Sequence, residues 1–269
     1  MQGSNFHTHS AFSDGRFTAR EMTEKAISLG FHSLGFSDHS YAELFEDYSM
    51  KLGTEKAYID EVRALSVEFK DKIKLYAGIE LDVDSPVPDV EFDYVIASVH
   101  GLMRGGKYYE IDSSAPKFDF LVNEGFGGSG VDMAKAYFER VTEHVIKSKP
   151  DFVGHFDLIT KFGTAPETDD GYINAALEAV REIVPHCNTF EMNTGAIARG
   201  LRVTPYPAEF ILDEIKRLGG RIIVTSDCHY RDKLTAWFDE AEAYLLSKGF
   251  VKNSSASLNG KIGGIEIWE

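Results

Sequence analysis

The strongest constraint on this chain is a pair of histidines near its amino terminus. His7 and His9 stand in the segment F-H-T-H at 6–9, and S-D-G follows at 13–15. In an extended strand, residues two apart face the same side at roughly 7 Å between Cα atoms, so both imidazoles can approach one ion. Imidazole pairs suit Zn²⁺, Mn²⁺ or Fe²⁺. Two packed, hydrogen-bonded histidines would give the same pattern, so the pair alone leaves both interpretations open.

Beyond this pair, strand-like and helix-like patterns alternate along the chain. The first helix is predicted to begin at Thr18, with Glu21 three residues later completing a capping box, and to end at Gly30. Further strands are predicted at 33–39, 74–83, 94–102, 151–158, 189–195 and 221–229, helices at about 54–71, 131–148, 170–184, 207–218 and 232–248, and a last strand at 262–268.

The alternation implies a parallel sheet, and the positions of the polar residues favour a barrel over an open sheet. Residues of metal-ligand type lie at the carboxyl ends of the first five strands and the seventh. In an α/β barrel these ends meet at one mouth. We therefore predict a seven-stranded α/β barrel as a single domain over 1–269. The glycine-rich insert at 103–130 is typical of a substrate lid or binding loop.

The candidate metal ligands are imidazoles and carboxylates at these strand ends. One buried histidine is more often a satisfied core residue than a ligand, but six of the nine histidines lie at strand ends. Asp227 and His229 are predicted to share a strand face, while Cys228 between them is interpreted as a packed residue. The candidates are His7, His9, Asp14, His39, Glu80, His100, His155, Asp227 and His229.

Other polar residues give weaker signals. Glu191 and Asn193 share a strand face, and either orient metal ligands or form an ordinary buried hydrogen-bonded pair. The remaining histidines lie in turns or within a helix and receive no role: they are His32, His144 and His186.

Charge and composition restrict the partners. The chain has a formal net charge of -15, which argues against binding nucleic acid or anionic membranes through bulk charge. Two cysteines form no disulfide framework, no leader precedes the first strand, and no apolar run approaches a membrane span. We expect a cytoplasmic protein whose partner is a small molecule, and the oligomeric state stays open.

Several short motifs together resemble those of the polymerase-and-histidinol-phosphatase (PHP) superfamily. They are H-T-H-S at 7–10, S-D-G at 13–15, S-D-H at 37–39, G-I-E at 78–80, S-V-H at 98–100, G-H-F-D at 154–157 and S-D-C-H at 226–229. The length, F-S-D-H-S at 36–40, the long insert and N-T-G-A-I-A-R-G at 193–200 resemble the histidinol-phosphate phosphatase branch.

The resemblance implies a distorted (β/α)7 barrel of the PHP type, with the active site at the carboxyl ends of the strands. It also implies three divalent metal ions, which could be Zn, Mn or Fe. On that pattern one ion would be held by His7, His9, Glu80 and Asp227, a second by Glu80, His100 and His155, and a third by Asp14, His39 and His229.

The implied activity is hydrolysis of L-histidinol phosphate to L-histidinol and inorganic phosphate, a reaction of histidine biosynthesis. Three divalent ions would outweigh the carboxylate ligands and attract a phosphate dianion. A metal-bridging hydroxide held by Glu80 and its neighbours would then attack phosphorus in line.

Other groups are expected near the phosphate and the leaving group. Arg199 and Lys161 lie in loops at the mouth and are predicted to bind phosphate, and Asp38 is either a proton donor or a structural hydrogen-bond partner of its surroundings. The ammonium and imidazole of histidinol require carboxylates or aromatic rings. The insert supplies Tyr108, Tyr109, Glu110, Asp112, Phe118, Asp119 and Phe120.

Two alternatives stay open at this stage. One is a PHP phosphoesterase acting on nucleotides or oligonucleotides, because S-D-G and the ligand set are common to both kinds of enzyme. The other is a non-catalytic PHP module with a structural or interaction role. Such a module is expected to have lost ligands, whereas this chain keeps a full candidate set.

Overall fold

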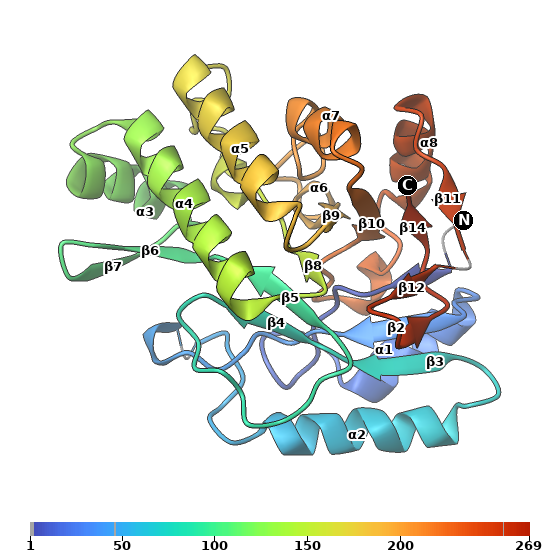
Figure 1. Cartoon of the computed structure of the whole chain (residues 1–269). Helices are drawn as coiled ribbons and strands as arrows, with labels where there is room; N and C mark the ends of the chain where they lie inside the picture. The colour runs from blue at the N-terminus through green and yellow to red at the C-terminus, as the bar shows by residue number, and fades with distance from the viewer. Residues whose placement is uncertain (1–2, 46, 255) are drawn as a thin grey trace.

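The computed structural model describes residues 3–45, 47–254 and 256–269, in which parallel strands alternate with helices that lie around them (Figure 1). The helices are α1 (Ala19–Ser28), α2 (Glu55–Glu68), α3 (Ala115–Phe120), α4 (Gly130–Ser148), α5 (Asp170–Ile183), α6 (Gly195–Ala198), α7 (Glu209–Arg217) and α8 (Phe238–Ser247). The strands are β1 (Ser4–Asn5), β2 (Ser33–Phe36), β3 (Lys74–Ala77), β4 (Ile79–Asp82), β5 (Val95–Ser98), β6 (Gly101–Arg104), β7 (Lys107–Glu110), β8 (Phe152–Val153), β9 (Thr189–Asn193), β10 (Arg221–Thr225), β11 (Lys252–Asn253), β12 (Ser257–Leu258), β13 (Ile262–Gly263) and β14 (Ile267–Trp268).

The parallel strands belong to two sheets that are joined at both edges, so that together they form a ring. One sheet has the order β1-β2-β3, and a second contains β10-β9-β8-β5-β4. Two single residue pairs join the sheets: Thr8, beyond β1, pairs with Cys228, and His39, beyond β2, pairs with Glu80 in β4. The backbone amide of His9 donates to the carbonyl of Cys228 at 2.9 Å. This ring is the arrangement expected of the predicted α/β barrel.

The ring is distorted at its amino end. There β10 pairs with the antiparallel strand β14, with Ile222 opposite Trp268. In the described residues, the backbone pair between the segments that follow β1 and β10 is Thr8 with Cys228, at the carboxyl end. The carboxyl ends of the strands, which carry the candidate ligands, are where the ring closes.

Helix boundaries follow the expected sequence signals. The capping box of α1 is confirmed: the Thr18 side chain accepts from the Glu21 amide, and the Glu21 carboxylate accepts from the Thr18 amide. Gly30 follows the end of α1 with φ of 81°, a left-handed conformation that glycine adopts without strain. Helix α8 begins at Phe238 rather than near residue 232, because residues 231–233 form a 3₁₀ turn and Trp237 has φ of 63°.

Some predicted strands were too long. The segment 74–83 is divided at Gly78, where a Cβ atom would lie 2.2 Å from the Tyr94 ring. The apolar run at 94–102 ends as β5 at Ser98, although Val99 and Leu102 are also buried, so apolar character did not reveal the break. In the segment 151–158 only Phe152–Val153 is strand.

The insert at 103–130 has secondary structure of its own, contrary to the absence of a clear pattern in its sequence. Its first part forms an antiparallel hairpin of β6 and β7, which projects at the left of Figure 1. Gly105 and Gly106 make the turn with φ of 57° and 75°. Helix α3 and a π-helical turn at Leu121–Gly125 follow. The role of the insert as a lid remains a prediction.

No helix in the described ranges combines the length and the apolar character that crossing a bilayer requires.

Tyr94 lies inside the ring of strands. Its aromatic side chain occupies space left by Gly35 and Gly78, where a Cβ atom would approach Tyr94 to 2.4 and 2.2 Å. Its hydroxyl lies 2.8 Å from the carbonyl oxygen of Phe6 and 2.9 Å from that of Phe36. One buried tyrosine thus connects the first two strands at the level below the ligands.

Replacing Tyr94 by Phe is expected to lower the free energy of unfolding by about 1–2 kcal/mol, because a buried hydrogen bond is lost without change of shape. Urea unfolding would measure the loss. Tyr76→Phe is the matched control, since the Tyr76 hydroxyl donates to the Gly263 carbonyl at 2.7 Å in a partly exposed position that water can reach. Equal losses in the two variants would contradict this role for Tyr94.

Candidate metal centre

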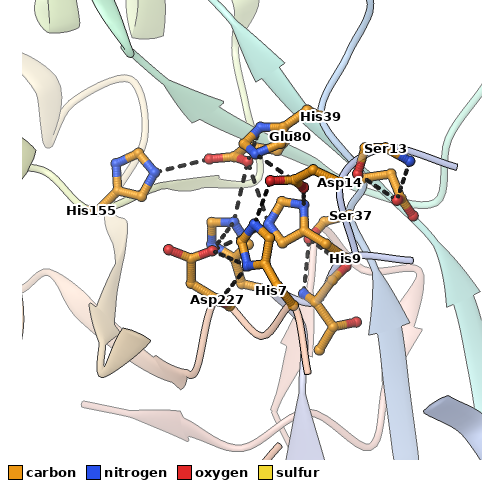
Figure 2. Close-up of polar contacts among 12 residues, drawn as sticks. His7, His9, Ser13, Asp14, Ser37, His39, Glu80, His155 and Asp227 are labelled. Atoms are coloured by element: carbon orange, nitrogen blue, oxygen red, sulfur yellow. Dashed lines mark hydrogen bonds and ion pairs between the residues drawn. The ribbon is translucent and has the colours of Figure 1, made fainter. Parts of the chain in front are cut away.

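The nine candidate ligands come together at the carboxyl ends of the strands. Figure 2 shows His7, His9, His39, Glu80 and Asp227 directed toward one another from four separate segments of the chain. Their ligand atoms form overlapping groups in which all atoms lie within 4.8 Å of one another. The groups are His9, Asp14, His39 and His229; His7, Glu80 and His155; His7, His9 and Asp227; and His39, Glu80 and His100. Together they contain every residue of the predicted set.

Glu80 is the central carboxylate. It is 1% exposed, and its two oxygens face imidazoles from different strands. Oε1 lies 2.9 Å from Nε2 of His155 and 3.4 Å from Nε2 of His100. Oε2 lies 2.7 Å from Nδ1 of His39 and 3.4 Å from Nε2 of His7. This position suits a carboxylate that is shared between neighbouring cations.

Asp14 forms the outer part of the cluster. Its Oδ2 lies 3.0 Å from Nε2 of His229, and its Oδ1 lies 3.8 Å from both His39 and His9. His9 therefore lies between two groups: its Nδ1 faces Asp14, whereas its Nε2 lies 3.2 Å from Asp227. The resemblance to the PHP superfamily assigned His9 only to the group that contains Asp227.

The backbone at Asp227 differs from the prediction. Asp227 has φ of 46°, so the segment 226–229 is not an extended strand, and the argument that Asp227 and His229 share a strand face is wrong. Both side chains still reach the cluster, because the left-handed turn redirects them. Such a conformation is costly for a residue with a Cβ atom and is frequent at functional sites. Cys228 is 1% exposed and packs in the core, as predicted.

Several buried atoms of the cluster have no hydrogen-bond partner within the described part of the chain. They include both ring nitrogens of His9, Nε2 of His7 and Oδ1 of Asp14. Buried polar atoms are normally paired, because an unpaired one loses the free energy of its hydration. Imidazole nitrogens and carboxylate oxygens directed at a common point are the donors that divalent transition metals prefer. These residues therefore fit a metal centre.

The charges of the cluster favour cations. Burial, together with His229 and His39, lowers the pKa of His9 to about 3, so this imidazole is neutral, which is the form that binds metals. Burial alone would raise the pKa of Glu80, but His39 and His7 hold it well below its usual range. Burial alone would also raise the pKa of Asp227, but Arg199 and His7 hold it well below its usual range. The cluster thus presents buried carboxylates in their charged form.

Known proteins resemble this chain in sequence and in fold. The model of the PHP domain family matches residues 5–195, more than half of the chain. The chain belongs to the PHP domain family. The matched range contains seven of the nine clustered residues, while Asp227 and His229 lie beyond it.

The relatives of this PHP domain cover nearly its whole length. The histidinol-phosphatase of Bacillus subtilis is 24% identical, over 85% of this chain and 94% of its own. The histidinol-phosphatase of Lactococcus lactis is 26% identical, over 93% of each chain. The crystal structure of the latter organism's histidinol phosphate phosphatase, complexed with zinc, L-histidinol and phosphate, has a TM-score of 0.67 at 24% identity and covers 92% of this chain and 93% of its own. This likeness shows that the fold is the PHP barrel.

The cluster of this PHP domain opens into a cavity of about 600 Å³. Arg199 lines it, with 34% of its side chain exposed, and its Nη2 donates to Oδ2 of Asp227 at 3.2 Å. Lys161 also lines it, but its Nζ donates to the carbonyl of Asp112 at 2.8 Å and pairs with its carboxylate at 3.1 Å. Arg199 therefore keeps an exposed part of its guanidinium for a ligand, whereas the charge of Lys161 is already compensated.

The insert contributes fewer groups to the cavity than its composition suggested. Glu110 and Asp112 line the cavity. Five other insert residues that were candidates do not line it: Tyr108, Tyr109, Phe118, Asp119 and Phe120.

Sequence reasoning missed the segment that follows β2. Glu43, Phe45, Asp47 and Tyr48 line the cavity. The Tyr48 ring stacks on Phe45 at 4.9 Å between centroids and meets the His39 ring edge-on at 5.1 Å. The available signal was the position of this segment, since loops after the carboxyl end of a barrel strand line the mouth.

The histidines without a predicted role lie outside the cluster. None of them belongs to a candidate metal group in the described ranges. His144 hydrogen-bonds the Leu81 carbonyl at 2.8 Å, and His32 lies 3.9 Å from Glu266.

The contacts of Asp38 are those of a structural residue. It is fully buried and does not line the cavity. It accepts hydrogen bonds from the amide and hydroxyl of Ser10, both at 2.8 Å, and from those of Ser13 at 3.0 and 2.6 Å. These contacts hold the loop that carries Ser13 and Asp14, both of which are labelled in Figure 2.

Two variants of Asp38 separate these roles. Asp38→Asn keeps an oxygen for most of the donors and is expected to retain stability and phosphate-monoester turnover. Asp38→Ala leaves buried amides unpaired and is expected to lose at least about 2 kcal/mol of unfolding free energy. Loss of turnover in a stable Asp38→Asn protein would instead identify a proton donor.

Proposed function

We propose that this chain is a metal-dependent phosphatase that hydrolyses L-histidinol phosphate to L-histidinol and inorganic phosphate. The observation that carries the proposal is the convergence of nine ligand-type side chains, Glu80 among them, at a cavity that also contains Arg199. Histidinol-phosphatases that match nearly the full chain support the choice of substrate.

The proposed metal sites are the three ligand sets that the PHP resemblance implies. The groups of side chains differ from them in detail, because His155 shares a group with His7 and Glu80, and His39 also shares one with Glu80 and His100. His7, His9, Glu80 and Asp227 would hold one divalent ion, Glu80, His100 and His155 a second, and Asp14, His39 and His229 a third, with His9 close to the last group as well. Zinc in the Lactococcus lactis relative supports zinc here, and the same donors accept manganese or iron. When bound, such ions supply positive charge to phosphoryl oxygens and acidify a coordinated water.

Arg199 would bind the phosphate. The chain carries a net charge of -15, so an anionic substrate needs local positive charge. A guanidinium provides a planar pair of donors that matches phosphate oxygens. The contact with Asp227 fixes the guanidinium beside the cluster. Lys161 would contribute its charge more weakly, because Asp112 already pairs with it.

The other side of the cavity would bind the alcohol part of the substrate. L-histidinol carries an ammonium and an imidazole, and the cavity offers the carboxylates of Glu43, Asp47 and Glu110 and the aromatic rings of Phe45 and Tyr48. Cations bind favourably to carboxylates and to aromatic faces. A volume of about 600 Å³ is that of a pocket for a small molecule.

The substrate is tested by comparing purified, zinc-loaded protein on L-histidinol phosphate and on a nucleoside monophosphate. We expect kcat/KM to be at least about 100-fold higher for L-histidinol phosphate, because only its cationic groups pair with the acidic side of the cavity. Equal or faster turnover of the nucleotide would favour the alternative phosphoesterase. A protein that takes up no zinc and hydrolyses neither compound would favour the non-catalytic module.

The metal and phosphate roles are tested with two variants. His9→Ala is expected to lose bound metal and all turnover, because His9 faces two ligand groups. Arg199→Ala is expected to raise KM about ten- to hundredfold with the metal content unchanged, as a charged hydrogen bond to phosphate is lost. Elemental analysis and steady-state kinetics measure both. Loss of metal from the arginine variant would show that Arg199 chiefly supports Asp227.

A further inference from the structure

One buried carboxylate beside the cluster belongs to none of the candidate metal groups. Glu191, in β9, is 0% exposed and does not line the cavity. Its oxygens nevertheless contact two of the proposed ligand residues directly, His7 and His155. We propose that Glu191 is a positioning residue, which fixes the tautomer of His7 and the placement of His155 and Asp227 for metal binding. This inference rests on the metal centre of the proposed function.

The contact with His7 determines which ring nitrogen is available. Nδ1 of His7 lies 2.8 Å from Oε2 of Glu191, and a carboxylate accepts hydrogen bonds but donates none. Nδ1 therefore carries a proton, which leaves Nε2 as the nitrogen that would bind a metal ion. Nε2 is the atom that lies 3.4 Å from Glu80 and has no hydrogen-bond partner among the described residues. A carboxylate behind a ligating histidine also raises the basicity of the ligand.

The same carboxylate reaches two other strands. Its Oε1 accepts from the backbone amide of His155, and its Oε2 accepts from the hydroxyl of Thr225 at 2.6 Å. Thr225 is the last residue of β10, two positions before Asp227. Glu191 thus connects β9 with β8 and β10 at the height of the ligands.

Asn193 extends the connection to Asp227. Its Oδ1 accepts from the amide of Gly195 at 2.8 Å, which fixes the orientation of the side-chain amide. Its Nδ2 consequently faces Oε1 of Glu191 at 2.9 Å and Oδ2 of Asp227 at 3.4 Å. The interpretation as an ordinary hydrogen-bonded pair is incomplete, because each member also contacts a proposed ligand.

Asp82 provides a comparison within the same molecule. It lies 2.9 Å from Nδ1 of His100 and accepts from the His100 amide at 3.1 Å, so it orients a single histidine. Glu191 instead acts on residues from more than one proposed metal site. Its removal is therefore expected to affect the centre more than removal of Asp82.

The test is zinc affinity, measured by competition with a chelator of known affinity and requiring no substrate. Glu191→Gln keeps the size of the side chain but directs an NH₂ group at one pair of donors, either His7 and Thr225 or His155 and Asn193. We expect zinc affinity to fall about 10- to 100-fold. In the zinc-loaded wild-type protein, long-range ¹H–¹⁵N spectra should show the His7 proton on Nδ1.

Glu214→Gln is the matched control. Glu214, in α7, is also buried, at 8% exposed, and accepts from Arg181 and Arg217, each at 2.6 Å. It lies outside the candidate metal groups, so its variant is expected to lose stability but to keep the zinc affinity. Zinc affinity that is unchanged in Glu191→Gln, or lowered equally in both variants, would overturn the proposal, as would a His7 proton on Nε2 in the zinc-loaded protein.

A second variant covers the case in which Glu191→Gln does not fold. Thr225→Val preserves shape and removes one donor to Glu191, and it is expected to lower zinc affinity several-fold; unchanged affinity in this variant would overturn the proposal. Wild-type turnover of L-histidinol phosphate is measured in parallel. Zinc binding that depends on Glu191 in a protein without turnover would contradict the proposed substrate and leave the role of Glu191 supported.

Discussion

The structure depends on one buried carboxylate, Glu80, which is surrounded by imidazoles and nearly inaccessible to water. A buried negative charge is costly unless it is compensated, and histidines from four other strands supply that compensation only if the strands form a ring. The closure of the PHP barrel and the assembly of the candidate centre therefore depend on each other. Changes that displace any of these strands would leave buried charges without partners.

The same backbone contacts close the ring of strands and align the proposed ligands with one another. Thr8 pairs with Cys228, and these residues separate His7 from His9 and Asp227 from His229. On the other side His39 pairs with Glu80, and both are proposed ligands. The backbone contacts that join the two sheets thus also set the relative height of the ligands. Slippage at either contact would displace ligands, since neighbouring residues face opposite sides.

Supporting residues decide how the clustered groups can act. Asp38 holds the loop that carries Asp14, and Glu191 joins three strands behind His7 and His155. On the open side, Arg199 is held by Asp227, and Tyr48 lies against His39. The lining of the cavity thus combines a cationic group beside the cluster with carboxylates and aromatic rings. This asymmetry suits a monoester with an anionic and a cationic end.

The sequence by itself determined the alternation of strands and helices, the capping of α1 and the nine candidate ligands, because these depend on local patterns and on strand ends. Only the tertiary structure decided what depends on contacts between distant segments. It showed that Asp227 has left-handed backbone, that Lys161 pairs with Asp112, that residues 43–45, 47 and 48 line the cavity and that Glu191 contacts two histidines. The direction of a side chain in a turn, and its partner across the barrel, follow from packing, which local residue patterns do not encode.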